Sequence, residues 1–162
     1  MLYFAYGSNM APARIEDRLG PCPLLGAATL AGYELAFHKR GRDGSGKCDA
    51  YRTGGDSLMY GAVFELTERQ SNALDRFEGP HYERQTIPLS LGGNEVEAFA
   101  YVALSHAIDT ALRPYPWYLA FVLHGAEVNQ LPKHYVEAIR RQPTIIDPDP
   151  KRQAVNDRIL SG

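Results

Sequence analysis

The sequence predicts a single α+β domain in which most strands precede most helices. Its 162 residues suit one domain, and 44% hydrophobic with 22% charged residues is ordinary for a globular chain. Short apolar segments bounded by glycine or proline fill the first hundred residues, which is typical of strands. Helical patterns opened by proline dominate after residue 115, and no internal repeat or linker divides the chain.

Seven segments have the composition of β-strands. The first, residues 2–6, is an apolar and aromatic run that ends at Gly7, so we expect it to be buried. The six that follow are residues 24–31, 33–38, 48–52, 58–66, 82–91 and 95–104. A Gly-Gly-Asn sequence at residues 92–94 separates the last two and predicts a β-hairpin. Residues 39–47 are rich in glycine and basic side chains, and we expect a mobile, solvated loop there, with contact to an acidic ligand as the alternative.

The clearest helix is predicted between residues 67 and 78. Thr67 with Gln70 three positions later forms a capping box, and Leu74 contributes to an apolar face. A Gly-Pro pair ends the helix, so Glu78 lies at or just past its carboxyl end.

Three further helices are predicted at residues 11–19, 116–128 and 132–141, the last two with proline near the first position. The remaining chain is rich in proline and aspartate. We therefore expect a domain of residues 1–142, followed by a weakly ordered tail or surface strap of residues 143–162.

Charge and cysteine content narrow the class of protein. Seventeen basic against nineteen acidic residues give a net charge of −2, which offers no argument for nucleic acid or a membrane surface as partner. Cys22 and Cys48 are too few for a disulfide scaffold, and the five histidines lack the spacing of a metal site. Without a signal-peptide pattern or a long apolar run, a cytoplasmic protein is the default expectation.

The first candidate for a functional segment is Tyr6-Gly7-Ser8-Asn9. A strand that ends in Gly-Ser-Asn exposes consecutive backbone N–H groups, and a helix beginning near Met10 would make them a site for a carboxylate or an oxyanion. The alternative is that these residues form an ordinary turn in which Asn9 caps the helix. Ser8 does not sit in the GxSxG elbow of serine hydrolases.

Glu78 is the second candidate. An aromatic neighbour and a helix carboxyl end both disfavour its charge, so we expect a raised pKa suited to general acid–base catalysis. The alternative is an exposed glutamate at a helix end. Tyr82, Trp117 and Tyr118 either line a pocket or belong to the core, and Tyr101 is given no function.

Three blocks in order resemble the γ-glutamylcyclotransferase family and its AIG2-like fold. The first is the strand at residues 2–6 with the Tyr-Gly-Ser-Asn turn that follows it. The second is residues 60–64, followed by the Leu-Asp-Arg-Phe-Glu-Gly sequence at 74–79 and by Tyr82. The third covers residues 114–118 and 124–135. Together the blocks span roughly residues 2 to 141, and their combination is far more specific than any one of them.

The resemblance implies a mixed β-sheet or small barrel with flanking helices. It also implies an intramolecular aminolysis, in which the α-amine of a γ-glutamyl group attacks its own γ-carbonyl and forms 5-oxoproline. In this chemistry Glu78 acts as general acid and base, and the Tyr6–Asn9 turn holds a carboxylate or the oxyanion. Tyr82 and Tyr118 correspond to aromatic residues of the family's substrate pocket.

The implied partner is a small γ-glutamyl compound, with no metal ion and no organic cofactor. Asn9 points to the branch that acts on γ-glutamyl amino acids, and a homodimer is implied by the resemblance alone. Three alternatives remain. One is a non-catalytic binding module of the same fold, and another is an enzyme that removes a γ-glutamyl protecting group from a larger amine. The last is an acyl transferase that uses Ser8.

Overall fold

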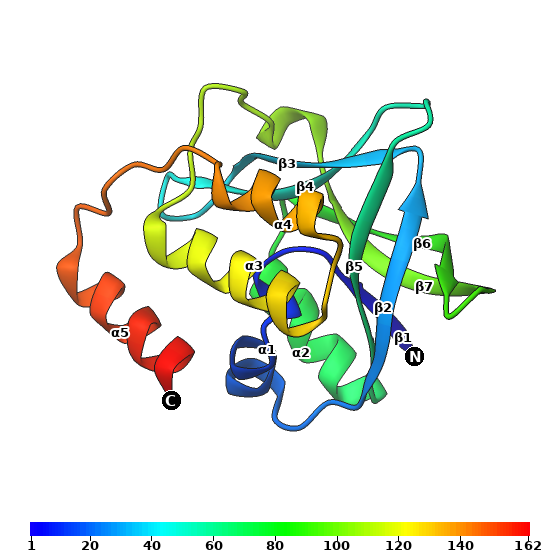
Figure 1. Ribbon diagram of the computed structural model, residues 1–162. Coiled ribbons are helices and arrows are strands. Elements are labelled where there is room, and N and C mark those ends of the chain that lie inside the picture. Colours follow the sequence, from blue (N-terminus) through cyan, green and yellow to red (C-terminus); the bar gives the residue numbers. More distant parts are fainter.

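Five strands close into a small barrel in the computed structural model, which describes residues 1–162 (Figure 1). The strand order is β1-β5-β2-β6-β7, and a parallel pairing of Tyr3 with Phe99 joins β1 to β7. The strands are β1 (Leu2–Ala5), β2 (Leu24–Ala31), β5 (Leu58–Glu65), β6 (Tyr82–Leu91) and β7 (Asn94–Ala103). The predicted α+β class and the small barrel are therefore confirmed.

A separate two-stranded sheet is formed by β3 (Tyr33–Arg40) and β4 (Gly46–Arg52). The prediction of a mobile loop at residues 39–47 is wrong, because both ends of this segment belong to the two strands. Asp43 organises the tight turn by accepting hydrogen bonds from the N–H and hydroxyl of Ser45 and from the Lys47 ammonium. Ser45 is completely buried beneath this turn.

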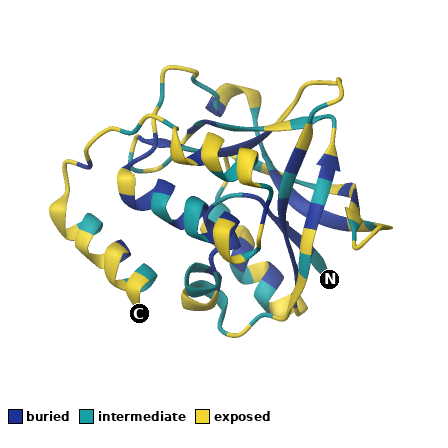
Figure 2. Ribbon diagram, in the orientation of Figure 1, coloured by how far each residue is buried: buried dark blue, intermediate teal, exposed yellow.

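Five helices form a layer beside the barrel: α1 (Pro12–Leu19), α2 (Glu68–Glu78), α3 (Pro116–Val128), α4 (Lys133–Arg140) and α5 (Pro150–Ser161). Figure 2 shows α3 largely buried at the centre of the helical layer, whereas α5 exposes its outer face. Gly125 allows the close packing of α3, because a Cβ there would lie 2.5 Å from the Cβ of Met10. The contact fixes α3 against the turn that follows β1.

Local signals in the sequence are reproduced in α2 and in the β6–β7 hairpin. Thr67 and Gln70 form the capping box, α2 ends at Glu78, and residues 92 and 93 adopt the positive φ angles of a tight turn. The helix predicted at residues 11–19 is confirmed as α1, but it does not begin near Met10. A single 3₁₀ turn (η1, Ser8–Met10) is followed by Ala11, which is extended. A proline disfavours helical geometry in the residue before it, so α1 begins only at Pro12.

The chain after residue 142 is an ordered strap that ends in α5, which packs against α1 and α3, and not a weakly ordered tail. Asp147 is the anchor, since its side chain is 1% exposed and accepts hydrogen bonds from the Trp117 indole at 2.7 Å and from Arg152. Farther along, Asn156 accepts from Arg14 of α1 at 2.8 Å. The ordered structure of this segment was not predicted from the sequence, because polar contacts with residues far away in the chain supply much of it.

Replacing Asp147 by Ala is expected to lower the free energy of unfolding by about 1–3 kcal/mol at pH 7, because the buried indole N–H of Trp117 loses its acceptor. The hydrogen bond from Arg152 outweighs burial and holds the pKa of Asp147 well below its ordinary value. A depressed pKa stabilises the fold above about pH 4, and this contribution is lost as the pH falls further.

The difference in unfolding free energy between wild type and Asp147→Ala should therefore narrow between pH 7 and pH 3. Urea unfolding at both pH values measures it. The exposed Asp157 of α5 provides the control substitution, Asp157→Ala. A difference that stays constant with pH would contradict the stabilising role of the Asp147 carboxylate.

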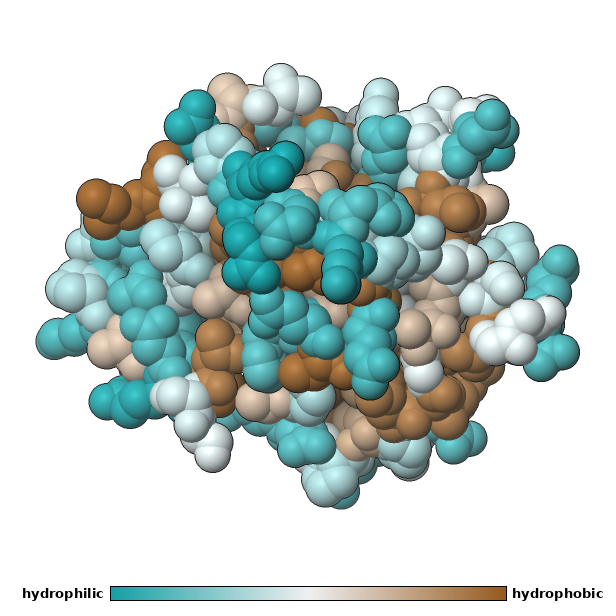
Figure 3. Space-filling view, in the orientation of Figure 1, coloured by the Kyte–Doolittle hydropathy of each residue, from teal (hydrophilic) through white to brown (hydrophobic).

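No helix of the structure combines the length and the apolar composition that a membrane span needs. Figure 3 shows hydrophilic side chains over most of one face, with apolar side chains gathered at its lower right, near the start of β2. Leu24 and Leu25, at the start of β2, are close to half exposed.

Candidate active site

A cavity of about 230 Å³ opens where the end of β1, the end of α2, the β3–β4 hairpin and the start of α3 meet. The structure brings together all the site residues that were predicted from the sequence and from the family resemblance. Those that line the cavity are Tyr6, Gly7, Ser8, Asn9, Glu78, Tyr82 and Tyr118. They come from three segments that are far apart along the chain: residues 6–9, 78–82 and 118.

Glu78 lies at the end of α2, with its side chain 16% exposed. Its Oε1 accepts a hydrogen bond from Asn9 Nδ2 at 3.0 Å and lies 3.5 Å from Arg18 Nη1. The carboxylate therefore has a fixed position at the cavity wall, with one amide donor and one cation beside it.

Asn9 is the centre of this small network. Its Nδ2 also donates to the Tyr3 hydroxyl at 3.0 Å, and its Oδ1 accepts from Arg18 Nη1 at 2.8 Å. Asn9 is only 4% exposed, so these contacts are the ones a buried amide needs. It caps no helix, which excludes the alternative in which Asn9 is a simple helix cap.

The turn between β1 and α1 packs directly on β4 and α3. A Cβ at Gly7 would lie 3.0 Å from the Cβ of Cys48 and 3.4 Å from the Tyr118 hydroxyl. The N–H of Gly7 makes no hydrogen bond within the protein, so this donor is available to a ligand. A free backbone donor and a carboxylate that line one cavity are groups that acyl-transfer chemistry uses.

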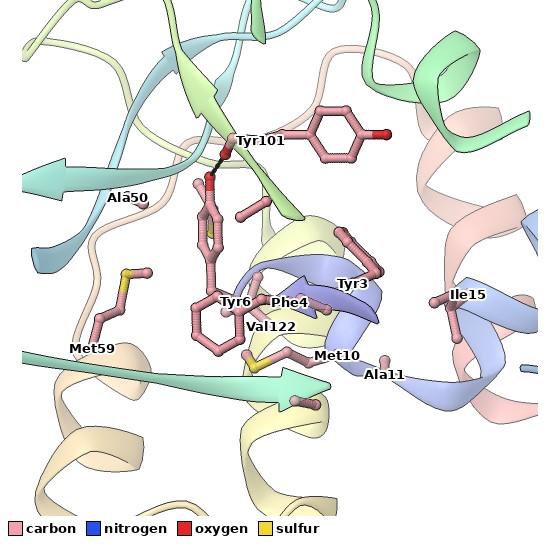
Figure 4. Packing of buried hydrophobic residues seen from close by; sticks show 14 of the residues in the cluster. Tyr3, Phe4, Tyr6, Met10, Ala11, Ile15, Ala50, Met59, Tyr101 and Val122 are labelled. Atoms are coloured by element: carbon pink, nitrogen blue, oxygen red, sulfur yellow. Dashed lines mark hydrogen bonds between the residues drawn. The ribbon is translucent and has the colours of Figure 1, made fainter. Parts of the chain in front are cut away.

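Three tyrosines form the aromatic wall, Tyr6 and Tyr118 buried and Tyr82 half-buried. The Tyr118 hydroxyl accepts from the backbone N–H of Cys48 at 3.0 Å, and the Tyr82 hydroxyl donates to the carbonyl of the same residue. Figure 4 shows the Tyr6 hydroxyl directed at the main-chain oxygen of Tyr101. Burial raises the pKa of Tyr6, Tyr82 and Tyr118 well above the ordinary value, so all three phenols are neutral at physiological pH.

Cations outnumber anions around the cavity. The basic side chains are Arg14, Arg18, Lys39, Arg42 and Lys47, and the acidic ones are Asp43 and Glu78. Burial lowers the pKa of Arg14 to about 10, and the neighbouring Arg18 adds to the effect. The Asp43 carboxylate forms an ion pair with Lys47 at 2.8 Å, which leaves a net positive field suited to an anionic ligand.

Sequence reasoning did not single out several of these residues. Arg14 and Arg18 stand four positions apart, so they share a face of α1, and this spacing was the available signal. Tyr101 was given no function, yet it lines the cavity. Alternation along β7 shows which residues share a face, but only the closed barrel shows what that face meets.

Comparisons with known proteins agree with this fold and identify the family. Residues 3–119 match the sequence model of the family described as "Gamma-glutamyl cyclotransferase, AIG2-like". Human γ-glutamylcyclotransferase is 26% identical over 148 residues, which cover 86% of this chain and 77% of the human protein. The bovine γ-glutamylcyclotransferase is 25% identical over 168 residues, covering 98% of this chain and 85% of the relative.

Solved structures show the same fold. A structure named gamma-glutamyl cyclotransferase superposes with a TM-score of 0.88 at 23% identity, covering 100% of this chain and 99% of that one. An uncharacterized protein from Homo sapiens gives a TM-score of 0.84 at 23% identity, with 99% and 98% covered. The matched sequence segment contains the turn after β1, Glu78, Tyr82 and Tyr118. This chain belongs to the AIG2-like γ-glutamyl cyclotransferase family.

Proposed function

We propose that this protein converts small γ-glutamyl compounds to 5-oxoproline and releases the amine or amino acid attached to the γ-carbonyl. The observation that carries the proposal is the Glu78 carboxylate, fixed by Asn9 at the wall of a cavity in a member of this family. The cationic surroundings suit a substrate that carries at least one carboxylate.

The reaction is an intramolecular aminolysis in which Glu78 moves the protons. The carboxylate takes a proton from the α-ammonium of the γ-glutamyl group, and the freed nitrogen attacks the γ-carbonyl carbon. The same carboxyl group then donates its proton to the leaving nitrogen as the original C–N bond breaks. The attacking nitrogen carries two protons after the attack and keeps one of them in 5-oxoproline. The other ends on the released amine, which departs as an ammonium. The attacking amine belongs to the substrate itself and closes a five-membered ring. Holding the substrate in the folded conformer therefore supplies much of the rate acceleration.

The turn after β1 is the proposed partner for the developing negative charge. The free N–H of Gly7 lies at the cavity and can donate to the former carbonyl oxygen or to the substrate α-carboxylate. Loss of one such donor in an oxyanion site typically costs about 10²–10³ in rate. The tyrosine wall around the turn excludes water and gives the substrate an apolar surface on which to pack.

Two of the alternatives are less well supported. An acyl transferase using Ser8 needs a base hydrogen-bonded to the hydroxyl, but no histidine lines the cavity and no side-chain hydrogen bond joins Ser8 to Glu78 or to a lysine. A non-catalytic binding module does not require a carboxylate at this position, whereas cyclisation does.

The test is a measurement of 5-oxoproline released from γ-glutamyl-alanine, a γ-glutamyl alkylamine and glutathione. We expect product from at least one of these classes. Calorimetric binding of 5-oxoproline accompanies the assay. Binding without turnover of any substrate would favour the non-catalytic module, and neither binding nor turnover would overturn the proposed function.

A further inference from the structure

The β3–β4 hairpin places two lysines directly opposite each other, and the protein neutralises only one of them. Lys39 and Lys47 are register partners across the antiparallel pair, and both line the cavity. Like charges opposite each other on a sheet are destabilising. Asp43 accepts a hydrogen bond from Lys47 at 2.8 Å, and the same ammonium lies 4.5 Å from the centroid of the Tyr118 ring.

Lys39 has no carboxylate partner. The residue is 4% exposed, and its ammonium makes no hydrogen bond or ion pair within the protein. It lies 4.2 Å from the centroid of the Tyr82 ring. Burial lowers the pKa of Lys39, and the negative charge of Glu78 opposes this effect. An ammonium that lines the cavity without a carboxylate partner is a group on which an anionic ligand can bind.

The proposed substrate has two carboxylates when its leaving group is an amino acid. The α-carboxylate is bonded to the carbon that carries the attacking amine, so it must lie near Glu78. Arg18 is the cation on that side, 3.5 Å from the Glu78 carboxylate. The second carboxylate belongs to the leaving group and lies beyond the γ-carbonyl, so it needs a separate cation.

The hairpin supplies a cation from another side of the cavity. Glu78 is the last residue of α2. Arg42, at the hairpin turn, donates to the main-chain oxygen of Arg76 at 3.3 Å, so the hairpin contacts the last turn of α2. Lys39 is thus close to the reaction centre but on a different element from Arg18.

We propose that Lys39 binds the carboxylate of the amino acid that the reaction releases, and that it thereby selects γ-glutamyl amino acids over γ-glutamyl amines. The inference rests on the proposed function. Lys39 forms and breaks no covalent bond and acts only as a charged N–H donor. It is a specificity-determining residue, separate from the acid–base group.

The experiment compares γ-glutamyl-alanine with γ-glutamyl-alaninamide, in which a neutral amide replaces the leaving-group carboxylate. Lys39→Met keeps a long unbranched side chain and removes the charge. We expect the wild-type ratio of kcat/KM for acid over amide to fall about tenfold or more in this variant, because one charge-assisted hydrogen bond is lost. Lys39→Arg keeps the charge and should retain part of the preference.

Arg40→Met is the matched control, because Arg40 lies on the same strand but is exposed and pairs with Asp109. Its ratio should equal that of wild type. Equal losses on both substrates in Lys39→Met would assign Lys39 to the shared γ-glutamyl half and overturn the inference, as would an unchanged ratio. In both cases the proposed function would stand. No 5-oxoproline from either substrate with wild-type protein would overturn the inference, and the proposed function would fall with it only if the γ-glutamyl alkylamine and glutathione also gave no product.

Discussion

Glu78→Gln is expected to reduce 5-oxoproline release by about 10³-fold or more, since general acid–base catalysis typically contributes 10²–10⁴ and this carboxyl handles both proton transfers. Gln has nearly the same shape, and its side-chain oxygen can still accept from Asn9 Nδ2. The variant should therefore fold and bind 5-oxoproline while it loses turnover. The measurement is steady-state product release together with calorimetric binding.

Glu68→Gln provides the control for this substitution. Glu68 is an exposed residue of the first turn of the same helix, at the opposite end from the cavity. Its activity should match that of wild type. If Glu78→Gln retained activity within a few-fold of wild type, Glu78 would not be the base, and the proton would have to reach another group.

Asn9→Ala should give the second large effect, a fall in kcat of about 10²-fold. Asn9 is a positioning residue that joins Glu78, Tyr3 and Arg18, and its loss frees the Glu78 carboxylate to move. A misplacement of about 1 Å in a catalytic group can cost this much. The buried polar partners left unsatisfied should also lower the stability, by about 1–3 kcal/mol.

The stability change is separated from the catalytic one by comparing three readouts. Thermal unfolding reports the fold, calorimetry with 5-oxoproline reports the pocket, and kcat reports the position of the carboxylate. Asn72→Ala, at an exposed position of α2, is the control. A full kcat in Asn9→Ala, together with a lowered unfolding temperature, would reduce Asn9 to a purely structural role.

Local signals determined the elements of this fold. The capping box of Thr67 and Gln70 and the Gly-Gly turn between β6 and β7 depend on neighbours within a few residues, so sequence alone predicted them. The position of Glu78 at the end of α2 followed from the same helix. A strap after residue 142 was one of two predicted alternatives, but its order and helix α5 were not predicted, because Asp147 and Asn156 depend on partners in α3 and α1.

The family resemblance, carried by short motifs, brought Glu78 and the turn after β1 into one predicted site. Tertiary structure alone decided which charges surround them. From the sequence, Lys39 and Lys47 were predicted to lie in a mobile basic loop, but both lie on the β3–β4 hairpin and line the cavity. The reason is physical: a charge pattern along the chain carries no information about desolvation. Whether an ammonium is hydrated, paired or left for a ligand is settled only when the elements around it pack.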